Sequence, residues 1–430
     1  MAEFKPYPLI FVVEAEHPRL RYTLDTVLKE ALGFAFVLQT PDVPRPPGKI
    51  PYFNYSSEPI PNTVSIPCDG LLYESHIRPQ GSVEYLFPAD SAENSSFPAA
   101  DPFSFFFYRL SEYAAYQSAE RDVHDRYLVT NTEPDLERLL RLLEAQFAPI
   151  YDPHNLPRKR REFDYEITID VDHPWKFRHK GAKVVLGSGL KDLVQGRFRT
   201  LAERVRYLSI GKEPFEVFSE IKRICPAEKT TLFFLVAGDH ANDSRFSLRM
   251  PAYRDLVQQY KDAGFSIGLH PSYLAYLDEA RILAEKKLLE SVVGPVHRSR
   301  QHYLRYRLPE TFTYLADAGI REEYSICPPS LLGAKTGLLR PYYWFDLQNN
   351  RATTLRLIPA FVMDRTLQQY LKMSPQAALP AIKSWVDQVK KWKGKFVLIL
   401  HNETFSETGE WRGWRSVIAE TVAYLQRNES

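Results

Sequence analysis

Short apolar runs alternate with helical segments through the second part of the chain. The helical segments span residues 254–263, 278–291, 309–318 and 375–392. Such alternation is typical of βαβ units, so the pattern predicts an α/β fold with a mostly parallel sheet or barrel. The strand candidates are YEITIDV (165–171), TLFFLVAG (231–238), FSIGLH (265–270), VVGPVHRSR (292–300), YSICP (324–328), LRLIPAFV (355–362) and FVLILH (396–401).

The first part of the chain has its own pattern. A strand at residues 9–13, a helix at 20–32 and a strand at 34–38 predict a small α/β unit, and the proline-rich and serine-rich stretch 41–67 predicts loops. Residues 101–117 begin with a capping aspartate and a proline, and their aromatic face predicts a buried helix. A helix at 134–147 precedes a polar linker, so we predict an N-terminal α/β domain at 1–157 and a second domain at 158–430.

The composition of the chain limits the classes of partner and the cellular compartment that we expect. The 55 Lys and Arg residues balance the 53 Asp and Glu residues, which argues against a nucleic-acid partner or an anionic membrane. Three scattered cysteines, Cys68, Cys225 and Cys327, suit a reducing compartment. The apolar run near the N-terminus is shorter than a signal core, and an 18-residue apolar stretch is absent from the sequence. We therefore expect a cytoplasmic protein without a membrane span; the oligomeric state is left open.

Ionisable side chains follow four of the strand candidates. Because the carboxyl ends of parallel strands meet at one edge, we expect these side chains to form one site. They are Asp170 and Asp172 after the first strand, His270 after the third, Arg300 and His302 after the fourth, and His401 with Asn402 after the last.

The spacing of the two aspartates suggests a cation. Asp170 and Asp172, two residues apart on a strand, project to the same face, where like charges are costly without a cation or a shared proton. Alternatively, Asp172 caps the turn before His173. A single histidine such as His270 is more often structural. Three histidines and two aspartates together are a suitable set for Zn²⁺ or a similar ion.

These segments resemble the motifs of the polysaccharide deacetylase family (NodB homology, family 4 carbohydrate esterases) over about residues 164–420. The resemblance implies a distorted (β/α)7-type barrel. It implies that Asp170 is the catalytic base, that Arg300 in RQHY steadies the base, and that Tyr303 lines the substrate groove. His401 in LILHNE matches the general acid.

The metal ligands depart from the family pattern. The resemblance implies that Asp172 and His270 bind a divalent metal, most readily Zn, with Co, Ni or Mn as alternatives. The family's second histidine is replaced by Leu274 in HPSYL. His302 stands where the family has a proline, and we hypothesise that it restores the missing ligand.

The resemblance implies a hydrolase that uses a metal-bound water to remove an N-acetyl or similar acyl group from a sugar or another N-acylated small molecule. Trp175, Tyr273, Tyr303 and Asn402 are candidate substrate-binding residues. The segments HPWKFRHKG, SRQHYLR and WRGWR, with the first domain, also resemble a divergent bacterial subgroup that carries an extra N-terminal domain.

Two alternatives stay open. One is a catalytically inactive deacetylase-like protein that binds a glycan or a partner, which the leucine at position 274 favours. The other is a metal-dependent glycosyltransferase that uses Asp170 and Asp172 to bind Mn²⁺ and a sugar nucleotide.

Overall fold

The structure, a computed structural model, describes residues 9–44, 52–79, 100–151, 161–179, 189, 193–196, 198–211 and 213–429. The chain forms two compact units. The first comprises Met1–Asp122, Val129–Arg161 and Ala334–Leu357, and the second comprises Val123–Leu128, Glu162–Gly333 and Ile358–Ser430. The predicted boundary at residues 157 and 158 lies outside the described residues.

The first unit contains a parallel sheet in the order β2-β1-β3-β4. The strands are β1 (Leu9–Val13), β2 (Phe36–Gln39), β3 (Tyr52–Tyr55) and β4 (Thr63–Ser65). Helix α1 (Pro18–Leu24) continues as a π-helical segment, Asp25–Ala31, where one helix was predicted. The small α/β unit predicted for residues 9–38 is therefore confirmed, but the prediction of loops at 41–67 was wrong in part, because β3 and β4 lie there.

Aromatic helices fill the core of this unit. Asp101 caps α2 (Pro102–Leu110) by accepting hydrogen bonds from the amides of Phe103 and Ser104. The predicted aromatic face is buried. The helix does not run to residue 117 as predicted, because Glu112 adopts a left-handed conformation (φ 50°) and α3 (Tyr113–Gln117) begins separately. Helix α4 (Asp135–Tyr151) follows, longer than predicted.

A β-hairpin from far along the chain also belongs to the first unit. Strands β10 (Tyr342–Asp346) and β11 (Arg351–Leu357) pair in antiparallel fashion. The ring of Phe345 lies 5.0 Å from that of Tyr22, and buried Glu137 forms an ion pair of 2.5 Å with Arg340. The strand predicted at 355–362 was thus wrong as one strand: its first residues end β11, and β12 (Val362–Met363) lies in the second unit.

The second unit is built on parallel strands in the order β9-β8-β7-β6-β5-β13-β12. They are β5 (Asp164–Val171), β6 (Thr230–Leu235), β7 (Ser266–His270), β8 (Arg298–Ser299), β9 (Glu322–Glu323), β12 and β13 (Lys395–His401). The predicted parallel arrangement is confirmed. Because the described pairings between strands of this unit do not join β9 to β12, closure into a barrel stays a prediction.

Two strand predictions need correction. Val292 and Val293 belong to helix α9 (Glu279–Val293), which ends where Gly294 adopts φ 76°, so only Arg298–Ser299 is strand. The strand expected at 324–328 is β9, which ends at Glu323. Both strands are only two residues long, and an apolar run therefore locates them poorly.

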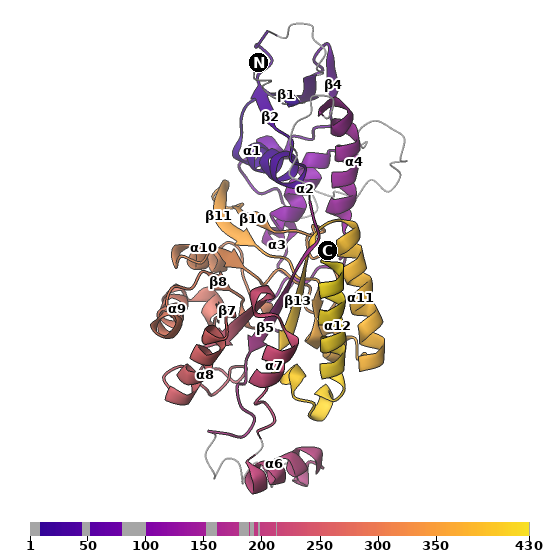
Figure 1. Cartoon of the computed structure of the whole chain (residues 1–430). Helices are drawn as coiled ribbons and strands as arrows, with labels where there is room; N and C mark the ends of the chain where they lie inside the picture. The colour runs from indigo at the N-terminus through magenta and orange to yellow at the C-terminus, as the bar shows by residue number, and fades with distance from the viewer. Residues whose placement is uncertain are drawn as a thin grey trace, which may run out of the picture. The chain divides into compact units, whose positions relative to one another are not determined.

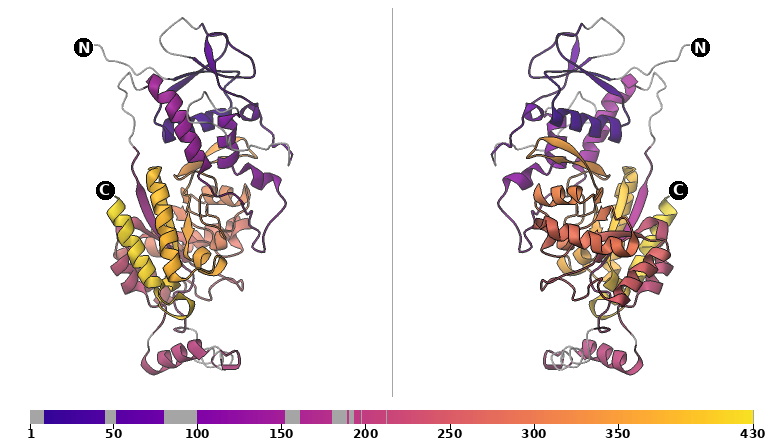
Figure 2. Two further views of the ribbon diagram at one scale, coloured as in Figure 1. Left: turned by 90° about the vertical axis from the view of Figure 1, so that its right-hand side faces the viewer. Right: turned by 90° about the vertical axis from the view of Figure 1, so that its left-hand side faces the viewer.

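Helices flank the strands of this unit (Figures 1 and 2). Helices α8 (Pro251–Asp262), α9 and α10 (Glu310–Asp317) lie on one side, and α11 (Pro375–Lys391) and α12 (Trp414–Asn428) on the other. The remaining helices are α6 (Phe198–Ile210) and α7 (Phe218–Ile224). The four predicted helices are confirmed within three residues, and the side chains of Asp278 and Ser374 cap α9 and α11. Among the described residues, no helix has the length and apolar character needed to cross a membrane.

Candidate functional site

The predicted ionisable residues come together at the carboxyl ends of the parallel strands. Asp170 of β5 lies in register with His401, the last residue of β13. His270 is the last residue of β7, and Arg300 directly follows β8. His302 begins the 3-10 turn η6 (His302–Leu304). Residues more than 200 positions apart in the sequence thus share one edge of the sheet.

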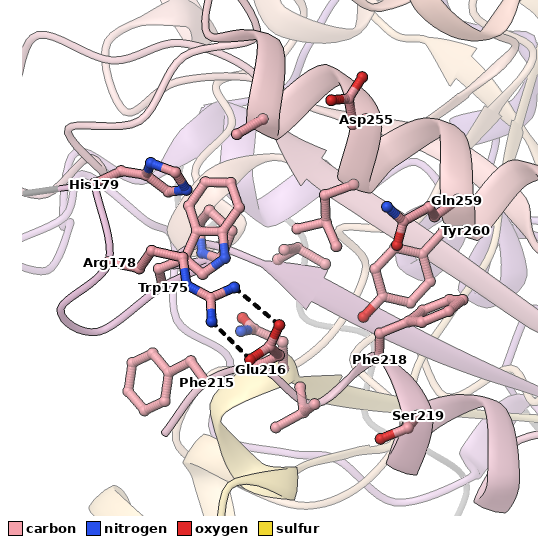
Figure 3. Close-up of a pocket in the computed structure, with 16 residues that line it drawn as sticks. Trp175, Arg178, His179, Phe215, Glu216, Phe218, Ser219, Asp255, Gln259 and Tyr260 are labelled. Atoms are coloured by element: carbon pink, nitrogen blue, oxygen red, sulfur yellow. Dashed lines mark hydrogen bonds and ion pairs between the residues drawn. The ribbon is translucent and has the colours of Figure 1, made fainter. Parts of the chain in front are cut away.

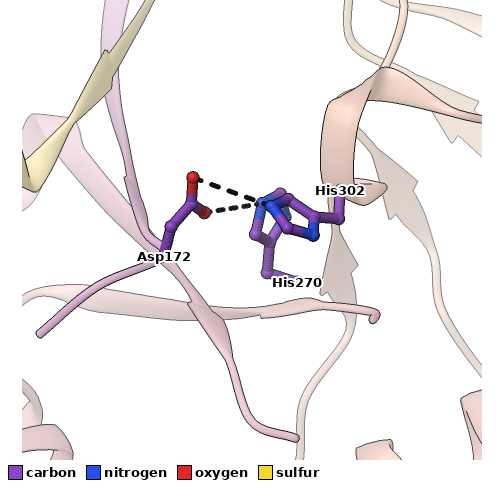
Figure 4. A group of neighbouring side chains, drawn as sticks. All are labelled: Asp172, His270 and His302. Atoms are coloured by element: carbon purple, nitrogen blue, oxygen red, sulfur yellow. Dashed lines mark ion pairs between the residues drawn. The ribbon is translucent and has the colours of Figure 1, made fainter. Parts of the chain in front are cut away.

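Asp172, His270 and His302 form a compact buried group (Figure 4). Nε2 of His270 lies 3.2 Å from Oδ1 of Asp172, and Nε2 of His302 lies 3.7 Å from Oδ2. One potential ligand atom from each residue falls within 4.8 Å of the others. Leu274, where the family's second histidine would stand, is 41% exposed. The structure therefore places His302, and not position 274, beside the aspartate.

The outer nitrogens of both histidines are held by acceptors. Nδ1 of His270 lies 2.6 Å from the carbonyl oxygen of Arg300, and Nδ1 of His302 lies 3.1 Å from Oδ1 of Asp243. A carbonyl or carboxylate only accepts, so Nδ1 carries a hydrogen in both rings, and Nε2, which has a lone pair whenever the imidazole is neutral, faces Asp172. Two lone-pair atoms facing a carboxylate need a proton or a cation between them. This donor set and its outer partners fit a Zn²⁺ site.

The charges in this group are strongly coupled. Burial alone would raise the pKa of Asp172, but His302, His270 and His401 together hold it well below its usual range. Burial would lower the pKa of His302, but Asp172 and Asp243 raise it to about 9. The carboxylate of Asp172 is therefore ionised and ready to bind a cation.

Asp170 is engaged by a fully buried arginine. Nη1 of Arg300 donates to Oδ1 of Asp170 at 2.7 Å, and Nη2 donates to the hydroxyl of Thr168 at 2.6 Å. The guanidinium also lies 4.6 Å from the ring centroid of Phe233. Oδ2 of Asp170 lies near the candidate metal-binding group of Asp172, His270 and His302, 4.0 Å from Nε2 of His270. The pair keeps one carboxylate oxygen occupied and directs the other toward the site.

His401 pairs with an aspartate that the sequence analysis did not identify. Nδ1 of His401 lies 2.7 Å from Oδ1 of Asp364, and Nε2 lies 3.9 Å from Oδ2 of Asp172. Burial opposes the charged imidazole, but Asp364 raises the pKa of His401. Burial likewise opposes the charged carboxylate, but His401 lowers the pKa of Asp364. Asp364 directly follows β12. The sequence signal that could have identified it is a charged residue immediately after an apolar run.

A cavity of about 180 Å³ opens onto these residues. Tyr303, which is 36% exposed, lines it together with Asp172, His270 and His302, and its role in substrate binding stays a prediction. Arg126, Arg365 and Tyr370 also line it, and the sequence analysis missed all three. Arg365 forms an ion pair with Glu403, one residue beyond Asn402.

The other predicted substrate-binding residues lie elsewhere. Trp175 and Asn402 line a different cavity of about 480 Å³ (Figure 3). Nδ2 of Asn402 donates to the carbonyl of His173 at 2.9 Å. Tyr273 is buried, with the guanidinium of Arg305 3.8 Å from its ring centroid. Their roles in substrate binding stay predictions.

Comparisons with known proteins give one family match and distant likenesses to solved structures. A family of unknown function, DUF7033, matches residues 9–133. Among solved structures, the chain is similar to a protein described as "putative polysaccharide deacetylase from Mycobacterium smegmatis", at 16% identity and a TM-score of 0.39, over 62% of this chain and 85% of that one. It is also similar to one described as "Agd3 a novel carbohydrate deacetylase", at 9% identity and a TM-score of 0.33, over 69% of this chain and 58% of that one. Both likenesses are distant. Comparison with curated proteins finds no match.

Proposed function

We propose that the second unit is a metal-dependent hydrolase that removes an N-acetyl or similar acyl group from a sugar or glycan. The observation that carries this proposal is the buried group of Asp172, His270 and His302, in which both Nε2 atoms face one carboxylate. Two imidazoles and a carboxylate are a common ligand set of hydrolytic zinc sites, which keep a further position open. Zn²⁺ is therefore the expected ion, with Co, Ni or Mn as substitutes.

The ion, when bound, would supply Lewis-acid activation of water and of the acyl carbonyl. Asp170 takes the proton from the attacking water, because its Oδ2 faces the metal-binding group while Arg300 holds Oδ1. Arg300 thereby fixes the orientation of the carboxylate that acts as general base.

His401 donates a proton to the departing amine. Asp364 accepts the Nδ1 hydrogen and favours the charged imidazole, so Nε2 carries a proton toward the cavity. Tyr303 and Tyr370, both partly exposed at this cavity, offer aromatic faces on which a sugar ring can stack. Base, acid and metal ligands thus each have a candidate within one cavity.

The glycosyltransferase alternative fits these contacts less well. It needs both Asp170 and Asp172 for a cation and a diphosphate, but Asp170 is paired with Arg300. The site also presents imidazole nitrogens, whereas Mn²⁺ sites of that kind prefer oxygen ligands. The alternative of a catalytically inactive, glycan-binding protein predicts no turnover whether or not metal binds.

Elemental analysis of the purified full-length protein, before and after chelation, tests the metal site. We expect one equivalent of Zn, Co, Ni or Mn, lost in His302→Ala and retained in His297→Ala, since His297 is exposed and outside the group. The metal-loaded protein is then assayed for acetate release from N-acetylated sugars. Absence of metal under every loading condition would refute the hydrolase; metal binding without acyl release from any such sugar would favour the inactive form.

A further inference from the structure

One short segment of the N-terminal part of the chain belongs to the second unit. Residues Val123–Leu128 are part of it, whereas the chain on both sides belongs to the first unit. His124 is held here by hydrogen bonds: its Nδ1 lies 3.0 Å from the hydroxyl of Tyr273, and its carbonyl accepts from Nε of Arg305 at 2.7 Å. We call residues 123–128 the strap.

The next residue of the strap is anchored by charge. Both carboxylate oxygens of Asp125 accept hydrogen bonds of 2.7 Å from Nη2 of Arg307, and Oδ2 also accepts one from the hydroxyl of Tyr276 at 2.7 Å. These bonds and those of His124 hold the two residues that precede Arg126. The position of Arg126 is therefore well determined.

Arg126 reaches from the strap to the turn that contains the candidate ligand His302. Its Nη1 donates to the carbonyl oxygen of Tyr303 at 3.0 Å, and its Nη2 donates to the hydroxyl of Tyr370 at 3.2 Å. The side chain is 7% exposed and lines the same cavity as His302. A buried guanidinium with two fixed acceptors is a rigid support.

The turn that Arg126 supports is strained. Tyr303 and Leu304 adopt φ values of 59° and 56°, and two consecutive left-handed residues with bulky side chains are unfavourable. Such strain persists only where surrounding contacts over-determine the backbone. Two backbone hydrogen bonds close the turn: the amide of Leu304 donates to the carbonyl of Gln301 at 2.9 Å, and the amide of Arg305 donates to the carbonyl of His302 at 3.2 Å. His302 lies inside this turn, so its direction depends on the turn being held.

We propose that Arg126 is a positioning residue for the metal site: it holds the strained turn so that His302 presents Nε2 to the ion. This inference rests on the proposed function, because it takes His302 as a ligand. Leu274 is exposed and has no ligand atom, so the second imidazole ligand must come from His302 on this turn. Metal binding in the second unit thus depends on the strap, which lies after strands β1–β4 within the residues that match DUF7033.

Zn²⁺ affinity, measured by competition with a chromophoric chelator on the full-length protein, tests the proposal. We expect Arg126→Ala to weaken Zn²⁺ binding about tenfold, as loss of a supporting contact around a metal ligand does. Arg126→Lys, which keeps one donor, should recover part of that loss. Arg121→Ala is the matched control, because the described hydrogen bonds of Arg121 go to the backbone carbonyls of Ala115, Ser118 and Glu120, away from the turn.

A double-substitution cycle separates positioning from general damage. In a His302→Ala background, Arg126→Ala should change Zn²⁺ affinity less than twofold, because the ligand that it positions is gone. The visible spectrum of the Co²⁺-loaded protein should change in Arg126→Ala and stay unchanged in Arg121→Ala. Should Arg126→Ala not fold, Arg126→Gln takes its place.

The outcomes distinguish the two proposals. If His302→Ala binds Zn²⁺ as tightly as the unaltered protein, the proposed metal site fails and this inference fails with it. If His302→Ala weakens binding while Arg126→Ala does not, or if Arg126→Ala is equally harmful in both backgrounds, the positioning role is overturned and the metal site stands.

Discussion

A single carboxylate, that of Asp364, fixes both the ring and the backbone of His401. Oδ1 lies 2.7 Å from Nδ1 of the imidazole, and Oδ2 accepts the amide hydrogen of the same residue at 2.7 Å. The hydroxyl of Thr404 also donates to Oδ2. The ring therefore has one orientation and one tautomer, with Nε2 directed toward Asp172.

Replacing this carboxylate should impair turnover more than binding. In Asp364→Asn the amide no longer favours the charged imidazole, and we expect kcat to fall roughly 100-fold with KM and bound metal nearly unchanged. Steady-state kinetics on an accepted N-acetylated sugar, with metal analysis of the same sample, measure this. Asp387→Asn is the control, because Asp387 accepts an exposed hydrogen bond from Tyr424 on another helix. A variant with unchanged kcat would contradict the acid role of His401.

Asp172→Asn should abolish metal binding with little loss of fold. The neutral amide removes the only carboxylate of the group formed with His270 and His302. We expect Zn²⁺ at about 100 times its Kd to stabilise the unaltered protein by about 2.7 kcal/mol and to leave Asp172→Asn unaffected. Thermal unfolding with and without Zn²⁺ measures the difference, and Asp255→Asn in the other cavity is the control. Equal stabilisation of both proteins would place the metal elsewhere.

Much of the site could be predicted because its residues follow long buried strands. His270 and His401 end their strands and Asp170 is the residue before the end of its strand; each strand has five or more residues, and the apolar pattern locates such strands well. Parallel pairing then brings their ends together without any further information. The place of His302 was predicted only as a compensation for Leu274, and the structure brings its side chain to Asp172.

The remaining parts of the site could not be read from local pattern. Strands β8, β9 and β12 are two residues long, so periodicity has nothing to act on, and Asp364 after β12 was overlooked. Arg126 precedes the predicted boundary between domains and reaches the second unit through tertiary contacts alone. The hairpin β10–β11 belongs to the first unit although it is far away in the sequence. Its membership also depends on tertiary contacts, which local pattern does not reveal.

Removing Arg300 should destabilise the second unit strongly. Its side chain is fully buried and neutralises Asp170, so Arg300→Met leaves a buried carboxylate without its partner. We expect a loss of about 3–5 kcal/mol in the free energy of unfolding, measured by urea denaturation. Adding Asp170→Asn to the Arg300→Met protein should restore most of the lost free energy of unfolding, because the uncompensated charge is then absent. A single variant as stable as the unaltered protein would show that the pair contributes nothing.

Glu323 should give the second unit a stability that depends on pH. It lies fully buried on β9, and burial raises its pKa to about 7, with Ser325 as its main hydrogen-bond partner. Between the ordinary glutamate pKa of about 4.3 and pH 7, the folded protein keeps a proton that the unfolded chain releases, so stability falls as pH rises through this range. The cost above pH 7 is on the order of 3 kcal/mol.

Glu323→Gln should remove this pH dependence, because a neutral amide of the same shape has no proton to lose. Urea unfolding at pH 5, 6, 7 and 8 then measures the unaltered protein against the variant. We expect the free energy of unfolding of the unaltered protein to decrease relative to that of the variant as pH rises, with most of the change complete by about pH 8. A constant difference across these pH values would mean that Glu323 titrates at the same pH in the folded and unfolded chains, and that burial on β9 has no effect on its charge.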